Sequence, residues 1–215
     1  MLAGFEDLSE GEIRLEGKVV SNKAKNLYVP PEHRNLGMVF QAFAVWPHLN
    51  VFDNVAFPLQ VQKRPKAEIE ERVNLALKQT NLLDQAKVFP SDLSGGEQQR
   101  IALARSIVVN PGILLLDEPL SNLDPKLRES MRFEIKRLQK EYNFTIVFVT
   151  HDQSEALALS DRLLVMNKGE IIQIGTPQEL YNKPVNLFVH NFLGESNFTK
   201  VVYRDGKVYA DGDTT

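Results

Sequence analysis

The 215-residue sequence contains no cysteine and no long apolar run. Without cysteine, the chain has no disulfides, no cysteine-ligated zinc, no iron–sulfur cluster and no thiol nucleophile. The longest apolar stretches, 113–116 and 144–149, are far shorter than the roughly 20 residues that span a bilayer. The opening residues show no basic region followed by an apolar stretch, so we expect no secretory signal.

Charge of one sign is also scarce, since 28 acidic and 25 basic residues leave a formal net charge of −3. Such a balance gives no reason to expect broad attraction to nucleic acid or to anionic lipid. Any site for a polyanion must therefore be local. The length is sufficient for one α/β domain with a buried core, or for one domain and part of another.

Strand and helix patterns alternate along the chain, which predicts a mostly parallel α/β sheet. Apolar runs predict strands over 36–40, 113–116 and 144–150, and we expect the last two to be buried on both faces. Apolar spacings of three and four predict a helix over 66–80, and another begins at Pro125 after the N-cap Asp124 and ends at a left-handed Asn143. Residues 41–54 form an aromatic- and proline-rich loop.

Shorter patterns predict the remaining elements of the chain. They are a hairpin over 12–20, a helix over 153–159, a hairpin over 162–174, a helix opened by a Thr176–Glu179 capping box, and a hairpin around Asp205-Gly206.

The segment Leu93–Arg100 opens a predicted helix with the sequence Leu-Ser-Gly-Gly-Glu-Gln-Gln-Arg. The glycines Gly95 and Gly96 would leave backbone N–H groups unobstructed at the positive end of the helix dipole, and Ser94 would add a hydroxyl donor, an arrangement that suits phosphate. Taken alone, the segment is better explained as a Ser N-cap with a flexible glycine pair.

Polar side chains also follow the predicted parallel strands, at the edge where open α/β folds bind ligands. Asp117 and Glu118 come after the strand at 113–116, where Asp117 could hold Mg²⁺ and Glu118 could polarise an attacking water. His151 follows the next strand and could contact a phosphate oxygen and a carboxylate. Gln41 ends an earlier strand and can bind water or metal. Each of these signals, taken alone, also fits ordinary loop chemistry.

Taken together and in this order, Gln41, Leu93–Arg100, Asp117-Glu118, 121–124 and His151 resemble the nucleotide-binding subunit of an ATP-binding cassette (ABC) importer. The likeness covers nearly the whole chain. Segments 38–41, 46–48 and 53–55 resemble the importer branch that has a C-terminal β regulatory domain. The resemblance implies catalytic roles for Glu118, His151 and Gln41, metal binding by Asp117 and Gln41, and ATP contacts from Ser94, Gly95, Gly96, Glu97 and Asp124. Glu97 stands where that branch usually has Gln.

The same resemblance implies cofactors and partners. ATP and Mg²⁺ would lie between two subunits paired head to tail, either a homodimer or a dimer with an intact ATPase subunit. Transmembrane permease subunits would dock near Phe43–His48, at the cytoplasmic face of the bacterial inner membrane, and a solute-binding protein would act with them. Residues 152–155, 166–169 and 198–212 most resemble the ferric-iron branch, with polyamine, phosphonate or sugar branches close behind.

The P-loop of the family, G-x-x-x-x-G-K-[ST], does not occur in the sequence. The nearest segment, Gly11 to Val19, has five residues between its glycines, has no Ser or Thr after its lysine, and lies in a predicted hairpin. We therefore expect an incomplete P-loop NTPase-like sheet over 1–194, with a helical subdomain at about 50–104, and the first strands of a regulatory β domain over 195–215. An internal fragment, a mis-started gene model or a truncated gene would give such a chain.

Two functional expectations follow from the missing loop. The chain alone should hydrolyse ATP negligibly, and the apolar side chains of Ile146 and Phe148 should be poorly covered.

Two alternative functions stay open. One is a non-catalytic partner that supplies its signature segment to an intact subunit. The other is a soluble ABC ATPase acting on nucleic acid, a class that usually has two cassettes or a long insertion; this chain has neither, nor a basic stripe, so no nucleic-acid partner is expected.

Overall fold

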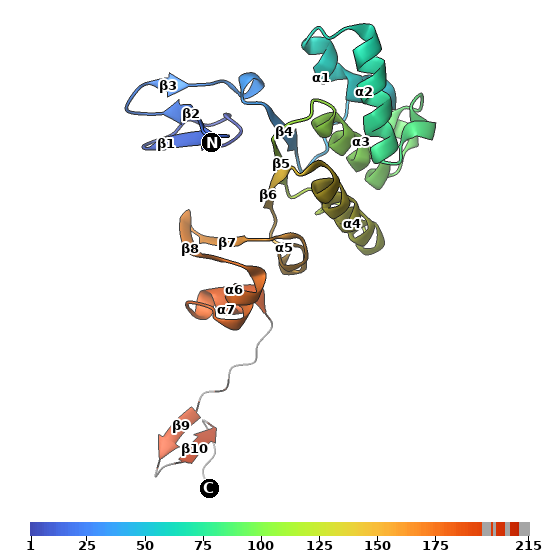
Figure 1. Ribbon diagram of the computed structural model, residues 1–215. Helices are drawn as coiled ribbons and strands as arrows, with labels where there is room; N and C mark the ends of the chain where they lie inside the picture. The colour runs from blue at the N-terminus through green and yellow to red at the C-terminus, as the bar shows by residue number, and fades with distance from the viewer. Residues whose placement is uncertain (195–198, 200, 205–206, 211–215) are drawn as a thin grey trace. The chain divides into compact units, whose positions relative to one another are not determined.

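The computed structural model describes residues 1–194, 199, 201–204 and 207–210 (Figure 1). It separates into two compact units, Met1–His151 and Asp152–Thr215, which are described one at a time. The sequence places its domain boundary after Gly194 instead. Residues 195–198 beside that boundary and the expected turn at Asp205-Gly206 lie outside the described residues, so the domain division stays a prediction. In the part of the chain that the structure describes, no helix is both long enough and apolar enough to cross a membrane.

The first unit contains a three-stranded parallel sheet, which confirms the expected α/β class. Its order is β4-β5-β6, from β4 (Leu36–Val39), β5 (Ile113–Asp117) and β6 (Thr145–Val149). The register places Val39 beside Leu116 and Leu116 beside Phe148. Because the strands run in the same direction, their carboxyl ends meet at one edge of the sheet, where ligands bind in open α/β folds.

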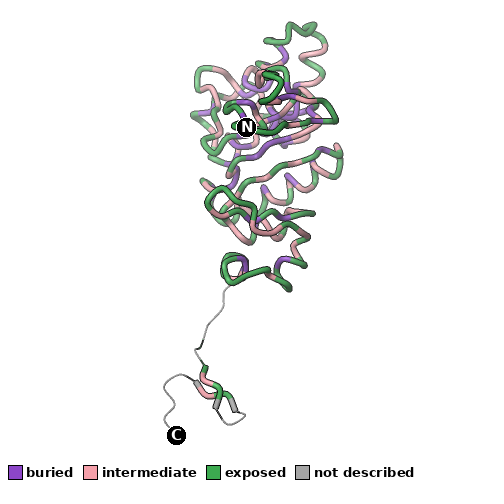
Figure 2. Tube along the Cα trace, turned by 90° about the vertical axis from the view of Figure 1, so that its left-hand side faces the viewer, coloured by how far each residue is buried: buried purple, intermediate pink, exposed green. Residues whose placement is uncertain are grey.

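Three helices, α1 (Val51–Val61), α2 (Lys66–Gln79) and α3 (Gly95–Ile107), pack against one another, and α3 also contacts β4. They share a fully buried apolar core that includes Val55, Leu59, Leu77 and Ile101. Figure 2 marks the buried residues of the chain in purple. The predicted helix over 66–80 is therefore confirmed to within a residue. Short 3-10 turns lie at Pro31–His33, Leu83–Gln85 and Pro90–Asp92.

The helix α4 (Pro125–Tyr142) begins and ends as its sequence predicts. Asp124 is the N-cap and its side chain accepts a hydrogen bond from Leu127 N, while Asn143 ends the helix with φ 53°. Met131, Ile135 and Leu138 are its buried residues.

The predicted loop over 41–54 is too long, because α1 already begins at Val51. Asn50 is its N-cap and accepts a hydrogen bond from Asp53 N at 2.8 Å. Pro58 lies inside this helix. Proline is typical of turns and loops, so the prolines of this region favour a loop where the structure has a helix that packs on α2 and α3.

Strand β6 is an edge strand of the described sheet. The prediction that it is buried on both faces is wrong, because one of its faces is exposed. Its residues alternate between half-buried and exposed, with Val147 36% and Val149 52% exposed. Ile146 and Phe148 are half-buried on the opposite face, so the poorly covered apolar surface lies chiefly on Val147 and Val149. A strand with one neighbour exposes one backbone edge, which a sequence of apolar residues does not reveal.

The chain begins with an antiparallel sheet of β1 (Glu12–Leu15), β2 (Lys18–Asn22) and β3 (Leu27–Tyr28), as the predicted hairpin requires. Buried Arg34 joins this sheet to the first residues of the chain, since its guanidinium donates to Ser21 Oγ and to the carbonyls of Met1, Leu2 and Val29. The segment Gly11–Val19, which is the nearest in the sequence to the P-loop pattern, thus lies in a hairpin and not in a phosphate-binding loop.

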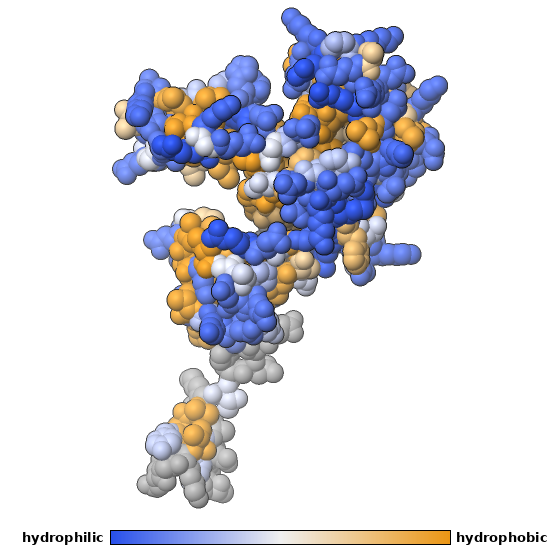
Figure 3. Space-filling view, in the orientation of Figure 1, coloured by the Kyte–Doolittle hydropathy of each residue, from blue (hydrophilic) through white to orange (hydrophobic). Residues whose placement is uncertain are grey.

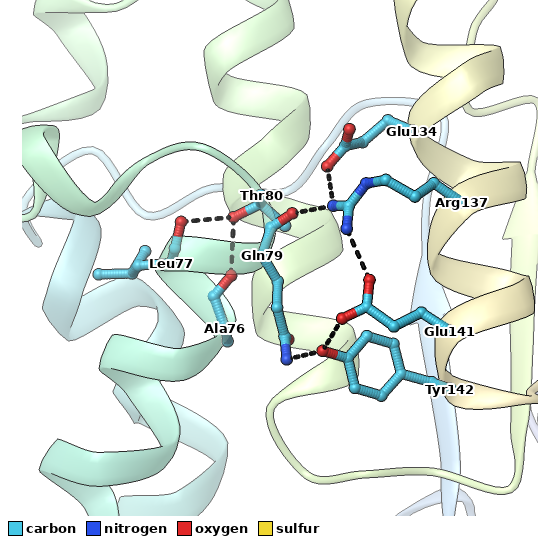
Figure 4. A network of polar contacts seen from close by, with 8 residues as sticks. All are labelled: Ala76, Leu77, Gln79, Thr80, Glu134, Arg137, Glu141 and Tyr142. Carbon is cyan, nitrogen blue, oxygen red and sulfur yellow. Dashed lines mark hydrogen bonds and ion pairs between the residues drawn. The ribbon is translucent and has the colours of Figure 1, made fainter.

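A polar network joins the end of α2 to the last turns of α4 (Figure 4). Arg137 donates to Glu134 and Glu141, each at 2.7 Å, and to the backbone carbonyl of Gln79. The Gln79 amide donates to Tyr142 Oη, which donates to Glu141 at 2.9 Å. Burial raises the pKa of Tyr142 to about 12, with its bond to Glu141 as the next cause.

In the second unit, the hairpin of β7 (Leu163–Asn167) and β8 (Glu170–Gly175) turns at Lys168 and Gly169, both with positive φ, as type I′ turns require. One face packs on the core residues Leu180, Val189 and Leu193. The other face presents the exposed pairs Leu164–Ile174 and Met166–Ile171, seen as apolar surface over the hairpin in Figure 3. The remaining elements are α5 (Gln153–Leu159), α6 (Pro177–Asn182), α7 (Leu187–Leu193), β9 (Val201–Arg204) and β10 (Lys207–Ala210).

Candidate functional site

Three side chains that the sequence assigns to one sheet edge meet there in the structure. Glu118 follows β5, Gln41 follows β4, and His151 follows β6. Gln41 Nε2 donates to Glu118 Oε2 at 3.1 Å, and His151 Nδ1 lies 3.2 Å from Glu118 Oε1. Both carboxylate oxygens of Glu118 are thus oriented by neighbours, and the predicted placement of the three residues is confirmed.

The backbone of Glu118 has a left-handed conformation with φ 43°, which is costly for a residue with a side chain. Backbone hydrogen bonds hold it there. Glu118 N donates to Val149 O at 2.9 Å, and the N–H and hydroxyl of Ser121 donate to Glu118 O at 3.2 and 2.9 Å. The turn after β5 therefore fixes the direction in which the Glu118 side chain leaves the sheet.

Asp117 ends β5 and is exposed at the same edge. Because the Gln41 amide nitrogen already donates to Glu118, its amide oxygen is the atom left to face a metal. Carboxylate and amide oxygens are ligands that Mg²⁺ accepts, usually together with water and substrate phosphates. Asp117 and Gln41 therefore fit a metal that brings further ligands with it. Within the described ranges, no three His, Asp or Glu side chains form a metal-binding group by themselves.

The N-terminus of α3 is closed by a capping box between Ser94 and Glu97. Ser94 Oγ and Ser94 N donate to Glu97 Oε2 at 2.6 and 2.9 Å, and Glu97 N donates back to Ser94 Oγ at 3.4 Å. The bonds from the Ser94 side chain and backbone lower the pKa of the Glu97 carboxyl. The Ser N-cap interpretation is thus confirmed for the chain by itself, and the Ser94 hydroxyl is already donated within the cap.

The two glycines of this segment differ in their surroundings. Gly95 is exposed, and a Cβ built on it would meet nothing within 4 Å. Gly96 is buried, and its Cβ would lie 2.3 Å from Leu127 Cδ2 on α4. The absence of a side chain at Gly96 therefore allows the close approach of two helices, whereas the prediction about the backbone N–H groups stays a prediction.

The segment after Glu118 is bonded to the Gln41 loop. Asn122 Nδ2 donates to Gln41 O at 3.0 Å, and Gln41 Nε2 lies 3.4 Å from Ser121 Oγ. Asp124, expected to contact ATP, uses its carboxylate to cap α4, where Oδ1 accepts from Leu127 N at 3.1 Å.

The aromatic segment Phe43–His48 is held in shape by two residues that the sequence did not single out. Arg105 on α3 donates to Ala44 O and Phe43 O at 2.8 and 3.0 Å, and its guanidinium lies 4.4 Å from the centre of the Trp46 ring. Asn54 on α1 bonds both the N–H and the carbonyl of Trp46. Burial lowers the pKa of the Arg105 guanidinium.

These contacts partly bury the aromatic side chains of the segment where the permease is expected to dock. Phe43 and Trp46 are half-buried, and Trp46 packs against Phe57 at 4.3 Å between ring centres, whereas Pro47 and His48 are exposed. A charged residue inside the apolar run 101–107 was the signal for Arg105, since charges inside such a run need partners.

Comparisons with known proteins agree with this geometry. The ABC transporter family matches residues 1–121. The chain is 54% identical over 198 residues to a spermidine/putrescine import ATP-binding protein PotA of Marinobacter nauticus, covering 92% of this chain and 52% of the relative. It is 46% identical over 211 residues to a trehalose/maltose import ATP-binding protein MalK of Thermococcus litoralis, covering 97% of this chain and 57% of that relative.

A solved structure, cbiO1 from Clostridium perfringens, described as part of the ABC transporter complex cbiONQ, matches with a TM-score of 0.75 and 30% identity, over 85% of this chain and 72% of that one. The chain spans about half the length of the two curated relatives. The family match covers more than half of the 215 residues, and the fold agrees with it. The chain therefore belongs to the ABC transporter family.

Proposed function

We propose that this sequence is part of the ATP-binding subunit of an ABC importer, and that Glu118 is the catalytic carboxylate. The observation that carries the proposal is the meeting of Glu118, Gln41 and His151 at one sheet edge, with both Glu118 oxygens oriented. A carboxylate fixed in this way is able to accept a proton from water that attacks a phosphoryl group, a contribution of about 10²–10⁴-fold in rate. Peripheral attachment to the inner membrane belongs to the same proposal.

The other site residues have supporting roles in this proposal. Gln41 and His151 orient Glu118, and their remaining polar atoms would be available to water or to a phosphate oxygen. Asp117, with the Gln41 amide oxygen, would hold Mg²⁺, which when bound neutralises charge on phosphoryl oxygens. The N–H group of the exposed residue Gly95 would receive the phosphates of ATP held by a second subunit, because a helix N-terminus favours anions. Ser94 would contribute after its N–H and hydroxyl exchange their bonds to Glu97 for bonds to the phosphates.

The first experiment measures Mg²⁺-ATPase activity of the chain with and without a P-loop segment from an intact family member joined ahead of Met1. We expect negligible activity from the 215-residue chain and clear activity from the hybrid. In the hybrid, Glu118→Gln should lower kcat by about 10²-fold or more. An inactive but folded hybrid would overturn the proposed role of this edge, and Glu118-dependent hydrolysis by the chain alone would overturn its inactivity.

A second experiment tests the signature segment, residues Leu93–Arg100, independently of Glu118. The chain is mixed with an intact family member, and the ATPase rate is followed as the chain is added. Stimulation should be reduced by Ser94→Ala, whereas Ser91→Ala, an exposed serine three positions earlier, should leave it unchanged. Stimulation by the mixed pair without any activity of the hybrid would favour a non-catalytic partner.

The solute and the permease contact are further parts of the proposal. The two curated relatives described above are named for polyamine and sugar import. We therefore propose one of these solute classes, and ferric iron has no support from these relatives. Uptake of labelled spermidine, maltose and ferric iron is compared between cells that have the gene and cells that lack it. The solute whose uptake is lost without the gene identifies the solute class, and loss of ferric-iron uptake alone would contradict the proposal.

For the permease, Ala44, Pro47 and His48 are the exposed residues of the segment 43–48. Arg105 bonds the carbonyl of Ala44, so Pro47 and His48 are the exposed residues that this arginine does not bond. Because the chain has no cysteine, His48→Cys gives a single crosslinking position. Crosslinking to a permease subunit supports docking there, and crosslinking from Ser91→Cys instead contradicts it.

A further inference from the structure

The side chain of Gln99 on α3 is buried in an unusual way for a polar residue. It is 1% exposed, its amide nitrogen donates to the backbone carbonyl of Pro119, and its amide oxygen has no hydrogen-bond partner among the described residues. A buried polar atom without a partner costs about 1–3 kcal/mol. An apolar residue of the same size would therefore fill this position better if packing were its only task.

Pro119 is the residue that directly follows Glu118. The turn that begins there is bonded from other sides as well. Glu118 N is bonded to Val149 O on β6, and Asn122 is bonded to the Gln41 carbonyl. The bond from Gln99 joins this turn to α3, the helix whose N-terminus carries Ser94 and Gly95.

We infer that Gln99 is a positioning residue that holds the Pro119 carbonyl and thereby sets the angle of the Glu118 carboxylate relative to Gln41 and His151. This inference rests on the proposed function for its effect on rate, but not for its effect on geometry. Glu118 has a left-handed backbone that the chain adopts only when the surroundings impose it. Releasing Pro119 removes one of the bonds that impose it.

The test uses Gln99→Met, which keeps the size of the side chain and removes the donor. Ser106→Ala is the matched control, because Ser106 is also buried on α3 and donates to a backbone carbonyl, that of Leu103 at 2.7 Å, with no bond to the turn after β5. In the hybrid ATPase, we expect Gln99→Met to lower kcat by about 10- to 100-fold, since small misplacements of a catalytic group have effects of this size. KM should change less than about twofold.

The second readout needs no activity. The chain has four histidines, so the ring signals of His151 can be assigned by NMR with a His151→Gln variant. Gln99→Met should move these signals in the 215-residue chain, because His151 lies against Glu118, whereas Ser106→Ala should leave them in place. A purely structural role of Gln99 would change the unfolding midpoint without moving the His151 signals.

The outcomes separate the inference from the proposed function. An active hybrid whose kcat is insensitive to Gln99→Met overturns the inference alone. Unmoved His151 signals in a folded Gln99→Met chain also overturn it. An inactive hybrid together with shifted His151 signals overturns the proposed function and supports the positioning role. If Gln99→Met does not fold, Gln99→Leu provides the same loss of donor with a different shape, and the same two readouts apply.

Discussion

The two glycines at the start of α3 should respond in opposite ways to the same substitution. An alanine is favoured over glycine within a helix by up to about 1 kcal/mol, and this gain applies to Gly95→Ala and Gly96→Ala alike. At Gly95 the added methyl group meets nothing within 4 Å, so the variant should be more stable than the parent. At Gly96 the methyl carbon would lie 2.3 Å from Leu127 Cδ2 and 2.6 Å from Leu127 Cδ1.

The difference between the two variants isolates that overlap, because the helix-propensity gain is common to both. Overpacking of this kind costs about 1–3 kcal/mol, so the free energy of unfolding of Gly96→Ala should be lower than that of Gly95→Ala by this amount. Urea unfolding followed by the fluorescence of Trp46, the only tryptophan, measures both values in the 215-residue chain. In a Leu127→Ala background the overlap disappears, and the two alanine variants should then differ little.

Equal stabilities of the two variants would refute the argument, as would a difference that persists after Leu127→Ala. The pair also separates packing from binding. If Gly95 is exposed because it faces a nucleotide held by a second subunit, Gly95→Ala should weaken stimulation in the mixed-subunit ATPase assay while raising the stability of the chain.

Three further predictions concern other parts of the structure. Ser94→Ala should lower the free energy of unfolding by about 1 kcal/mol through loss of the cap. Because the native pKa of Glu97 is lowered, the part of this difference that depends on the Glu97 carboxylate should be lost as the pH falls below 4.5, and a difference unchanged at low pH would contradict this. Because the native pKa of Tyr142 is raised to about 12, its contribution to the free energy of unfolding is complete below pH 10 and is lost as the pH rises toward 12. Tyr142→Phe should therefore flatten the fall of the unfolding midpoint at alkaline pH, and an equally steep fall in the variant would refute this prediction. Arg105→Met should shift the emission of Trp46 and speed proteolysis of the 43–48 loop, and an unchanged spectrum would show that the guanidinium does not order the loop.

Much of the candidate site could be predicted because its residues follow apolar strands at fixed positions. The buried run at 113–116 placed Glu118 at a sheet edge, and the apolar run at 144–149 placed His151 at the same edge. Local chemistry also determined the caps, since Ser94, Asp124 and Thr176 are each followed by a helix whose N–H groups they bond. These features depend on a few neighbouring residues, so they can be predicted from the sequence.

What the sequence could not predict depends on contacts between distant segments. The burial of Gly96 is decided by Leu127 on another helix, and the half-buried state of Trp46 is decided by Arg105 and Phe57. The exposure of Val147 and Val149 is decided by what packs on that face of β6 and not by their own apolar character. In each case the residue type agrees with more than one environment, and only tertiary packing selects between them.

Tertiary packing also stabilises the residues around the site that have a strained backbone. Phe43, Ala44 and Glu118 all have positive φ, between 43° and 55°, although none is glycine. Side chains from α3 bond to carbonyls at or next to all three, because Arg105 bonds the carbonyls of Phe43 and Ala44 and Gln99 bonds that of Pro119. Non-glycine residues adopt this conformation only where surrounding contacts offset a cost of about 1–3 kcal/mol each. One helix therefore stabilises both the turn that carries the proposed catalytic carboxylate and the loop proposed to meet the permease, so a displacement of α3 would change both places together.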